Sequence, residues 1–108
     1  MAKGYLIDTS AVIKYLNKTF SVKAISYIDD VVDSESNISF ISEIELQAWN
    51  PSNSKDILVY IQFVKSSHIF GISPQIIDET ILIRKKHKLK IADALIAATA
   101  VMNDFILL

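Results

Sequence analysis

With 108 residues, 51% of them hydrophobic and 21% charged, the sequence is long enough to bury one hydrophobic core and too short for two. Only two Gly and two Pro exclude disordered and low-complexity classes, and the lack of Cys excludes disulfide frameworks, thiol catalysis and zinc-thiolate sites. A formal net charge of −1 gives no overall attraction to nucleic acid or membrane, so any basic contact surface has to be local.

The first half of the chain is predicted to contain two strands and three helices. A short apolar run predicts a buried strand at residues 5–7, and a helix is expected at 11–16. Ser21 is a typical helix cap, and apolar residues at helical spacing follow it. A second strand is expected at 38–41 and a short helix at 42–49.

The second half repeats this alternation. A helix at 55–66 follows a turn cluster, and a strand is expected at 68–72. Pro74 is a favourable first residue for the next helix, because its missing N–H needs no partner there. A last helix at 91–102 and a strand at 105–108 complete the chain. Strands separated by helices of this length predict an α/β fold with a mostly parallel sheet covered on both faces, in one domain over residues 1–108.

Apolar periodicity also predicts which helix faces are buried. The helix 91–102 is apolar all round and is expected to be buried. The aromatic residues Trp49, Tyr60 and Phe63 are interpreted as packing residues of the core or of a dimer interface. The predicted buried face of the helix 55–66 carries Ile57, Leu58, Ile61 and Val64.

Neither end of the sequence nor its middle suggests a membrane or secreted protein. The amino terminus reaches a charge, Asp8, after three apolar residues, which is too soon for a secretory leader. Asp93 interrupts the longest apolar stretch, which stays below the roughly 18 residues of a membrane span. We therefore expect a cytoplasmic protein without a membrane partner.

Three acidic residues, Asp8, Glu45 and Asp93, lie in segments whose pattern is otherwise apolar. A buried carboxylate is costly unless it is paired, hydrogen-bonded or bound to a cation, so three in one small domain suggest a shared ion. Asp8 follows the first predicted strand directly, at the carboxyl end where open α/β sheets place ligand sites. Considered alone, Asp8 is better interpreted as a helix N-cap.

Helical periodicity places the other two. At about 100° per residue, Glu45 falls between Ala48 and Trp49 on the apolar arc, whereas Glu43 falls on the polar side. The alternative for Glu45 is a surface carboxylate at a poorly predicted helix boundary. Asp93 is the one charge in an apolar helix, and we favour a functional role over an exposed first-turn Asp stabilised by the helix dipole.

The segments around these residues resemble a known family. In order and spacing, Leu-Ile-Asp-Thr-Ser at 6–10, Ile-Ser-Phe-Ile-Ser-Glu-Ile-Glu-Leu at 38–46 and residues 89–100 resemble the PIN-domain ribonucleases, particularly the VapC-type toxins. The resemblance implies an α/β/α sandwich with a four-stranded sheet, a Mg²⁺ or Mn²⁺ site and endonucleolytic cleavage of RNA. It also implies a homodimer and inhibition by a co-encoded antitoxin protein.

Asp8, Glu45 and Asp93 are then the expected catalytic residues and metal ligands, directly or through water. An oxygen-only set without nearby His or Cys favours hard cations such as Mg²⁺ or Mn²⁺ over zinc. Such an ion would bind a phosphate oxygen, activate a water for attack on phosphorus and stabilise the departing oxygen. Thr9 and Ser10 match the residues beside the family's first Asp, where a hydroxyl either orients a carboxylate or bound water, or caps the helix.

A run of basic residues without any acid precedes the last helix and is a candidate contact for the RNA backbone. The alternative is a solvated helix end, since cations are favoured there by the helix dipole. Neither His68 nor His87 lies in a motif, and neither is assigned to catalysis. The candidate RNA contacts are Arg84, Lys85, Lys86, Lys88 and Lys90.

The sequence departs from the family pattern at its end. PIN domains usually continue past the fourth strand into a segment with another acidic residue, whereas the sequence here ends at Leu108. Asp104 is no substitute, because the last strand separates it by roughly 13 Å from the strand end where the site is expected. The expectation is therefore a short or truncated fourth-strand region, a fourth acid supplied otherwise, or a catalytically weak domain.

Three functions follow in order of preference. The first is a Mg²⁺- or Mn²⁺-dependent endoribonuclease, the toxin of a type II toxin–antitoxin pair. The alternative is a catalytically weak PIN-like module that acts by binding antitoxin or RNA. Phosphoryl transfer through an aspartyl intermediate on Asp8 is disfavoured, because Ser10 stands where such phosphatases carry a second acid.

Overall fold

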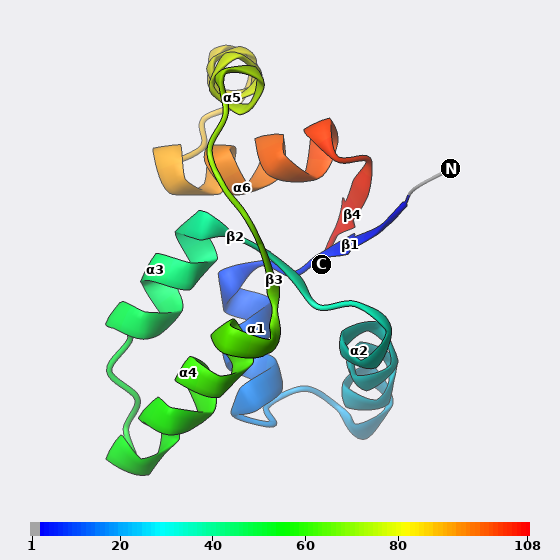
Figure 1. Ribbon diagram of the computed structural model, residues 1–108, viewed down its shortest axis with the longest axis vertical. Coiled ribbons are helices and arrows are strands. Elements are labelled where there is room, and N and C mark those ends of the chain that lie inside the picture. The colour runs from blue at the N-terminus through cyan, green and yellow to red at the C-terminus, as the bar shows by residue number, and fades with distance from the viewer. Residues whose placement is uncertain (1–2) are drawn as a thin grey trace.

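Short strands alternate with helices along the chain (Figure 1), as the sequence pattern predicts. The structure is a computed structural model that describes residues 3–108. Met1 and Ala2, which belong to the predicted domain and to the amino-terminal segment tested for a secretory leader, lie outside the described residues. None of its helices over these residues has the length and apolar character needed to cross a membrane. In chain order the elements are β1 (Gly4–Leu6), α1 (Thr9–Leu16), α2 (Val22–Ser34), β2 (Asn37–Ser39), α3 (Phe40–Ala48), η1 (Ser54–Asp56), α4 (Ile57–Ser66), β3 (His68–Phe70), α5 (Pro74–Lys86), α6 (Ile91–Met102) and β4 (Phe105–Leu107).

The four strands form two parallel pairs, β1 with β4 and β2 with β3. The pairs meet between β1 and β2, where the Ile7 N–H donates to the Asn37 carbonyl oxygen at 2.9 Å. Beside it, the side-chain amide of Asn37 donates to the Tyr5 carbonyl oxygen at 3.0 Å. Because a side chain satisfies this carbonyl, the regular ladder is interrupted and the expected four-stranded sheet is present as two joined pairs.

Helices cover both sides of the strands (Figure 1). α5 and α6 pack together on one side, and α1, α2 and α4 lie on the other, with α3 leading from the strands toward α4. The predicted α/β/α arrangement is therefore confirmed.

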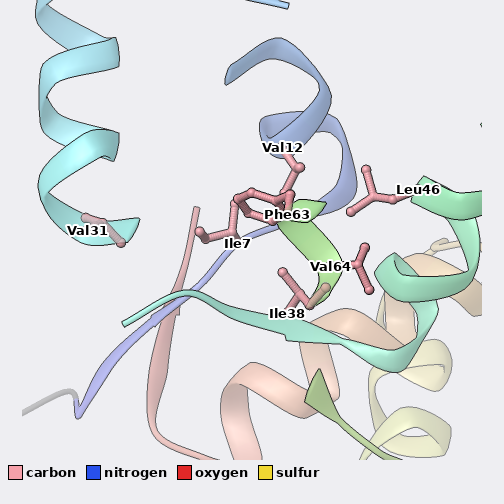
Figure 2. Packing of buried hydrophobic residues seen from close by; sticks show 7 residues of the cluster. All are labelled: Ile7, Val12, Val31, Ile38, Leu46, Phe63 and Val64. Carbon is pink, nitrogen blue, oxygen red and sulfur yellow. The ribbon is translucent and has the colours of Figure 1, made fainter. Parts of the chain in front are cut away.

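The last residue of β1 and the residue that follows it are both buried, on opposite sides of the strand. Leu6 packs with Ile96 and Ala100 of α6, whereas Ile7 points into the larger cluster on the opposite side. Figure 2 shows this larger cluster, which joins α1, α2, β2, α3 and α4. The packing fixes the chain up to the residue before Asp8. The members of the larger cluster are Ile7, Val12, Val31, Ile38, Leu46, Phe63 and Val64.

Each strand ends one or two residues earlier than the sequence predicts, and the difference is largest for β2 and β3. β2 ends at Ser39 and α3 begins at Phe40, because the Ser39 hydroxyl accepts a hydrogen bond from the Ile41 N–H at 3.1 Å and caps the helix. Residues 40–41, predicted as strand, are therefore helical. β3 also ends earlier than predicted, at Phe70.

The predicted buried faces of two helices were partly wrong. In α4 the bulky Tyr60 and Phe63 face the core, which turns Leu58 outward at 68% exposure. Val64 is the only member of the predicted α4 face that is fully buried, although Ile61 is half-buried. α6 is buried through its middle, and only the ends of the helix expose apolar side chains, at Ile91, Val101 and Met102.

Candidate active site

The three acidic residues singled out in the sequence line one open pocket of about 420 Å³. Asp8 follows β1, Glu45 lies in α3 and Asp93 lies in the first turn of α6. The fold thus brings together three segments that are far apart in the sequence. The remaining residues that line the pocket are Thr9, Ser10, Ile13, Ala48 and Trp49.

Two backbone hydrogen bonds hold Asp8 at the carboxyl end of β1. Its N–H donates to the Leu108 carbonyl oxygen at 3.0 Å, and its own carbonyl accepts from the Val12 N–H at 3.0 Å. Asp8 occupies the N-cap position of α1, but its carboxylate makes no capping bond to the first turn of that helix, all of which is described. The capping interpretation therefore holds for the backbone of Asp8 and not for its carboxylate, which lines the pocket.

A chain of hydroxyl groups orients Glu45. The Thr9 hydroxyl donates to Oε1 of Glu45 at 2.7 Å, and Thr9 Oγ1 lies 2.8 Å from the Ser42 hydroxyl. Since Thr9 has one hydroxyl proton and gives it to Glu45, Ser42 is the donor in the second bond. Ser42 is fully buried, so its contact with Thr9 is shielded from water. Of the two roles expected for Thr9, the structure shows that its hydroxyl orients a carboxylate.

The carboxylates are less buried than the sequence pattern suggests. Asp8 is half-buried, whereas Glu45 and Asp93 are exposed. The apolar arc around Glu45 includes Ala48 and Trp49, and these side chains line the open pocket rather than the core. Asp93 lies on the exposed side of the first turn of α6, next to buried Ala94, so the expectation that its carboxylate would be buried was wrong.

Burial raises the pKa of Asp8 above its ordinary value, and the negative charges of Asp93 and Glu45 raise the pKa further. The backbone N–H of Thr9 acts in the opposite direction and lowers the pKa. The charges of Glu45 and Asp93 are therefore close enough to Asp8 to oppose its ionisation. A cation bound among them would relieve this repulsion.

The donor chemistry of the pocket fits a hard divalent ion. It offers carboxylate and hydroxyl oxygens and no nitrogen or sulfur ligand, which suits Mg²⁺ or Mn²⁺. Over residues 3–108, no three His, Cys, Asp or Glu side chains form a ligand group for one ion as they stand. Mg²⁺ usually keeps several water molecules when it binds one or two carboxylates, so a complete protein ligand set is not required.

The basic run lines a different, open cavity of about 600 Å³ at the connection between α5 and α6. Its side chains are all exposed. The fold does not bring them into the acidic pocket, although the run leads directly into the helix that carries Asp93. The candidate RNA contacts in this cavity are Arg84, Lys85, Lys86, Lys88 and Lys90.

Asp104 lies at the amino end of β4, where its carbonyl oxygen accepts from the Lys3 N–H at 2.8 Å. Leu108 pairs with Asp8 at the other end of the same strand. The structure therefore agrees with the sequence argument that Asp104 cannot reach the acidic pocket.

Two residues of the site were missed by sequence reasoning. Ser42 lies three residues before Glu45, a spacing that places both on one helix face and that was a usable signal. Trp49 was interpreted as a packing residue, but it is 43% exposed and lines the acidic pocket. No local pattern distinguishes such a Trp from one in the core.

The fold and this pocket define an α/β/α protein with carboxylates gathered at the carboxyl end of a parallel strand, the usual place for a ligand site in this class. Residues 5–108 match the PIN domain family, and the chain therefore belongs to that family. No match was found among curated proteins.

Solved structures that share the fold include three from toxin–antitoxin or VapBC complexes. A toxin-antitoxin complex from Klebsiella pneumoniae contains a chain 22% identical, with 96% of this chain and 83% of that chain covered and a TM-score of 0.73. VapBC2 from Rickettsia felis, bound to a promoter DNA fragment, has a chain 18% identical, with coverages of 95% and 84% and a TM-score of 0.76. DNA-bound VapBC from Salmonella typhimurium has a chain that is 19% identical, with 96% of this chain and 83% of that chain covered and a TM-score of 0.76.

Proposed function

We propose that this chain is a divalent-metal-dependent endoribonuclease and the toxin of a type II toxin–antitoxin pair. The observation that carries the proposal is the gathering of Asp8, Glu45 and Asp93 around one pocket of a PIN-domain fold. Membership of this family supports nuclease activity. The similar folds in toxin–antitoxin and VapBC complexes support an antitoxin as the partner protein.

In this proposal Asp8, Glu45 and Asp93 hold Mg²⁺ or Mn²⁺, directly or through water, and the ion supplies the Lewis acid for phosphodiester hydrolysis. Thr9 keeps the Glu45 carboxylate turned toward the pocket, and buried Ser42 keeps the Thr9 hydroxyl in place. Ser10, which also lines the pocket, is the second hydroxyl beside Asp8.

The basic cavity formed by residues 84–90 is proposed to hold the RNA backbone. It contains no acidic side chain, and it adjoins the start of the helix that carries Asp93. Lys and Arg side chains bind phosphates through charge, so this contact supplies affinity without reading sequence. We further propose that the protein acts in the cytoplasm, and that it forms a homodimer, which the family resemblance implies.

A cleavage assay with labelled structured RNA tests the enzyme proposal. Wild type is expected to cut in Mg²⁺ or Mn²⁺ and not in chelator, and Asp93→Asn should lose the activity. Asp30→Asn changes an exposed acid on α2, outside the acidic pocket, and should cut like wild type. Metal-independent cutting, or equal cutting by wild type and Asp93→Asn, would contradict the proposal.

A second candidate is a catalytically weak PIN-like module that binds antitoxin or RNA. One observation favours it: the described carboxylates are not arranged as a finished ligand group. This candidate predicts RNA binding without cleavage at any metal concentration. The same RNA, used in binding and cleavage assays side by side, distinguishes the two.

A further inference from the structure

Trp49 stands at the boundary between two cavities. It follows the last residue of α3, and its extended backbone (φ −69°, ψ 135°) turns the chain away from the helix. Its side chain is 43% exposed and lines both the acidic pocket and a second cavity of about 310 Å³. The indole is therefore a wall shared by the proposed metal site and a neighbouring space.

The second cavity lies between the end of α1 and the loop from α3 to η1, and polar groups edge it. Asn17 accepts a hydrogen bond from the buried Tyr60 hydroxyl at 2.8 Å, and Asn53 accepts one from the Lys55 N–H at 3.0 Å. With each amide oxygen held by the protein, the amide NH₂ is the group that Asn17 and Asn53 offer to a ligand. Lys18 and Asp56 add one charge of each sign to the lining.

We propose that this cavity is a nucleobase subsite and that the base stacks on Trp49 while its neighbouring phosphate lies in the acidic pocket. The inference rests on the proposed ribonuclease function and extends it to the positioning of substrate. Single-stranded RNA is held through bases stacked on aromatic side chains, and every base has a face that can stack.

The arrangement favours a nucleotide over a purely apolar ligand. A large planar side chain is left partly in water, next to three carboxylates on one side and to amide groups, a lysine and the single carboxylate of Asp56 on the other. A nucleotide has the matching parts in sequence, because its phosphate suits a metal site, its flat base suits the indole, and its base edge pairs with amides. The volume falls at the small end of ligand pockets, which span about 300–1,000 Å³.

Trp49 is the single tryptophan of the sequence, so its fluorescence reports this contact directly. The experiment uses Asp93→Asn protein in Mg²⁺, since this variant is expected not to cleave, and a short single-stranded RNA oligonucleotide as the probe. Binding should quench the fluorescence, and an abasic oligonucleotide of the same length should quench it much less. Equal quenching by both, or no quenching at saturating RNA, would overturn the stacking proposal.

Cleavage kinetics give a second readout. Trp49→Ala in otherwise wild-type protein should raise KM about tenfold, since stacking is worth enough for a change of that size, and should leave kcat within about twofold. Trp49→Phe, which keeps an aromatic face, should restore most of the loss. Leu58→Ala removes another exposed apolar side chain, outside both cavities, and should leave KM and quenching unchanged.

Failure of the subsite and failure of the enzyme give different results. If RNA quenches Trp49 but no metal supports cleavage, the ribonuclease proposal fails while base stacking stands. If wild type and Trp49→Ala cleave with the same KM, and base-containing RNA quenches no more than abasic RNA, the subsite proposal alone fails.

Discussion

The Thr9 hydroxyl donates a 2.7 Å hydrogen bond to Oε1 of Glu45 across 36 positions of sequence. This bond joins the start of α1 to α3. Buried Ser42, also in α3, makes a second hydrogen bond to the same Thr9 hydroxyl. The segments that carry Asp8 and Glu45 are thus held together by side chains as well as by the core.

Thr9→Val tests this connection. The substitution keeps the shape of the side chain but removes the hydroxyl, so buried Ser42 loses its partner and Glu45 loses its restraint. We expect a loss of about 1–3 kcal/mol in the free energy of unfolding. Cleavage should fall about 10- to 100-fold, as for other groups that orient metal ligands. Urea denaturation and the cleavage assay measure the two effects.

Thr9→Ser is the matched control, because it retains the hydroxyl and should keep most of the activity. Thr9→Val with wild-type cleavage would show that the orientation of Glu45 does not matter for the reaction.

The raised pKa of Asp8 predicts a pH-dependent stability. Because this pKa lies above the ordinary value of 3.8, the folded protein binds the proton more tightly than the unfolded chain does. The stability contributed by protonated Asp8 is therefore present below pH 3.8 and is lost as pH rises through the raised pKa. Asp8→Asn, which cannot ionise, should stabilise the metal-free protein at neutral pH.

Urea denaturation in chelator at several pH values measures this effect. The advantage of Asp8→Asn over wild type should grow as pH rises from about 4 to 7. Glu43→Gln, on α3 but outside the pocket, should show no such trend. If wild type is as stable as Asp8→Asn at pH 7, then burial and the neighbouring charges do not oppose the ionisation of Asp8.

Salt dependence tests the basic cavity. Removing two charges with Lys86→Gln and Lys88→Gln should weaken RNA binding and reduce the slope of log affinity against log salt by about 1.4, or about 0.7 for each lost contact with a single strand. The paired control, Lys55→Gln with Lys65→Gln, removes the same charge outside this cavity. Equal slopes for the two pairs would assign the RNA contact elsewhere. Binding is measured with Asp93→Asn protein so that the RNA stays intact.

The fold and the positions of the acidic residues were largely predictable because they depend on local patterns. The short apolar run at residues 5–7 predicts a strand, and Asp8 follows it directly. Asp8 is therefore expected at the carboxyl end of that strand, where ligand sites of open α/β sheets lie. Helical spacing placed Glu45 on the arc with Ala48 and Trp49, and the structure keeps those three together.

Exposure was less predictable because it depends on which neighbours complete the packing. In α4 two faces are apolar. The face with Tyr60 and Phe63 packs into the core, and Leu58 is therefore exposed. Likewise Trp49 was interpreted as a packing residue of the core or of a dimer interface, yet 43% of its surface is exposed. The early start of α3 at Phe40 depends on the capping bond of Ser39, which competes with continuation of the strand.

The central claim is that Asp8, Glu45 and Asp93 together bind a divalent ion, and the melting temperature measures it most directly. Adding Mg²⁺ or Mn²⁺ should raise the melting temperature of wild type in a concentration-dependent way, because the ion binds the folded state. Asp93→Asn should abolish the shift, and Asp30→Asn, outside the pocket, should retain it. If wild type and Asp93→Asn melt together at every metal concentration, the three carboxylates do not share an ion.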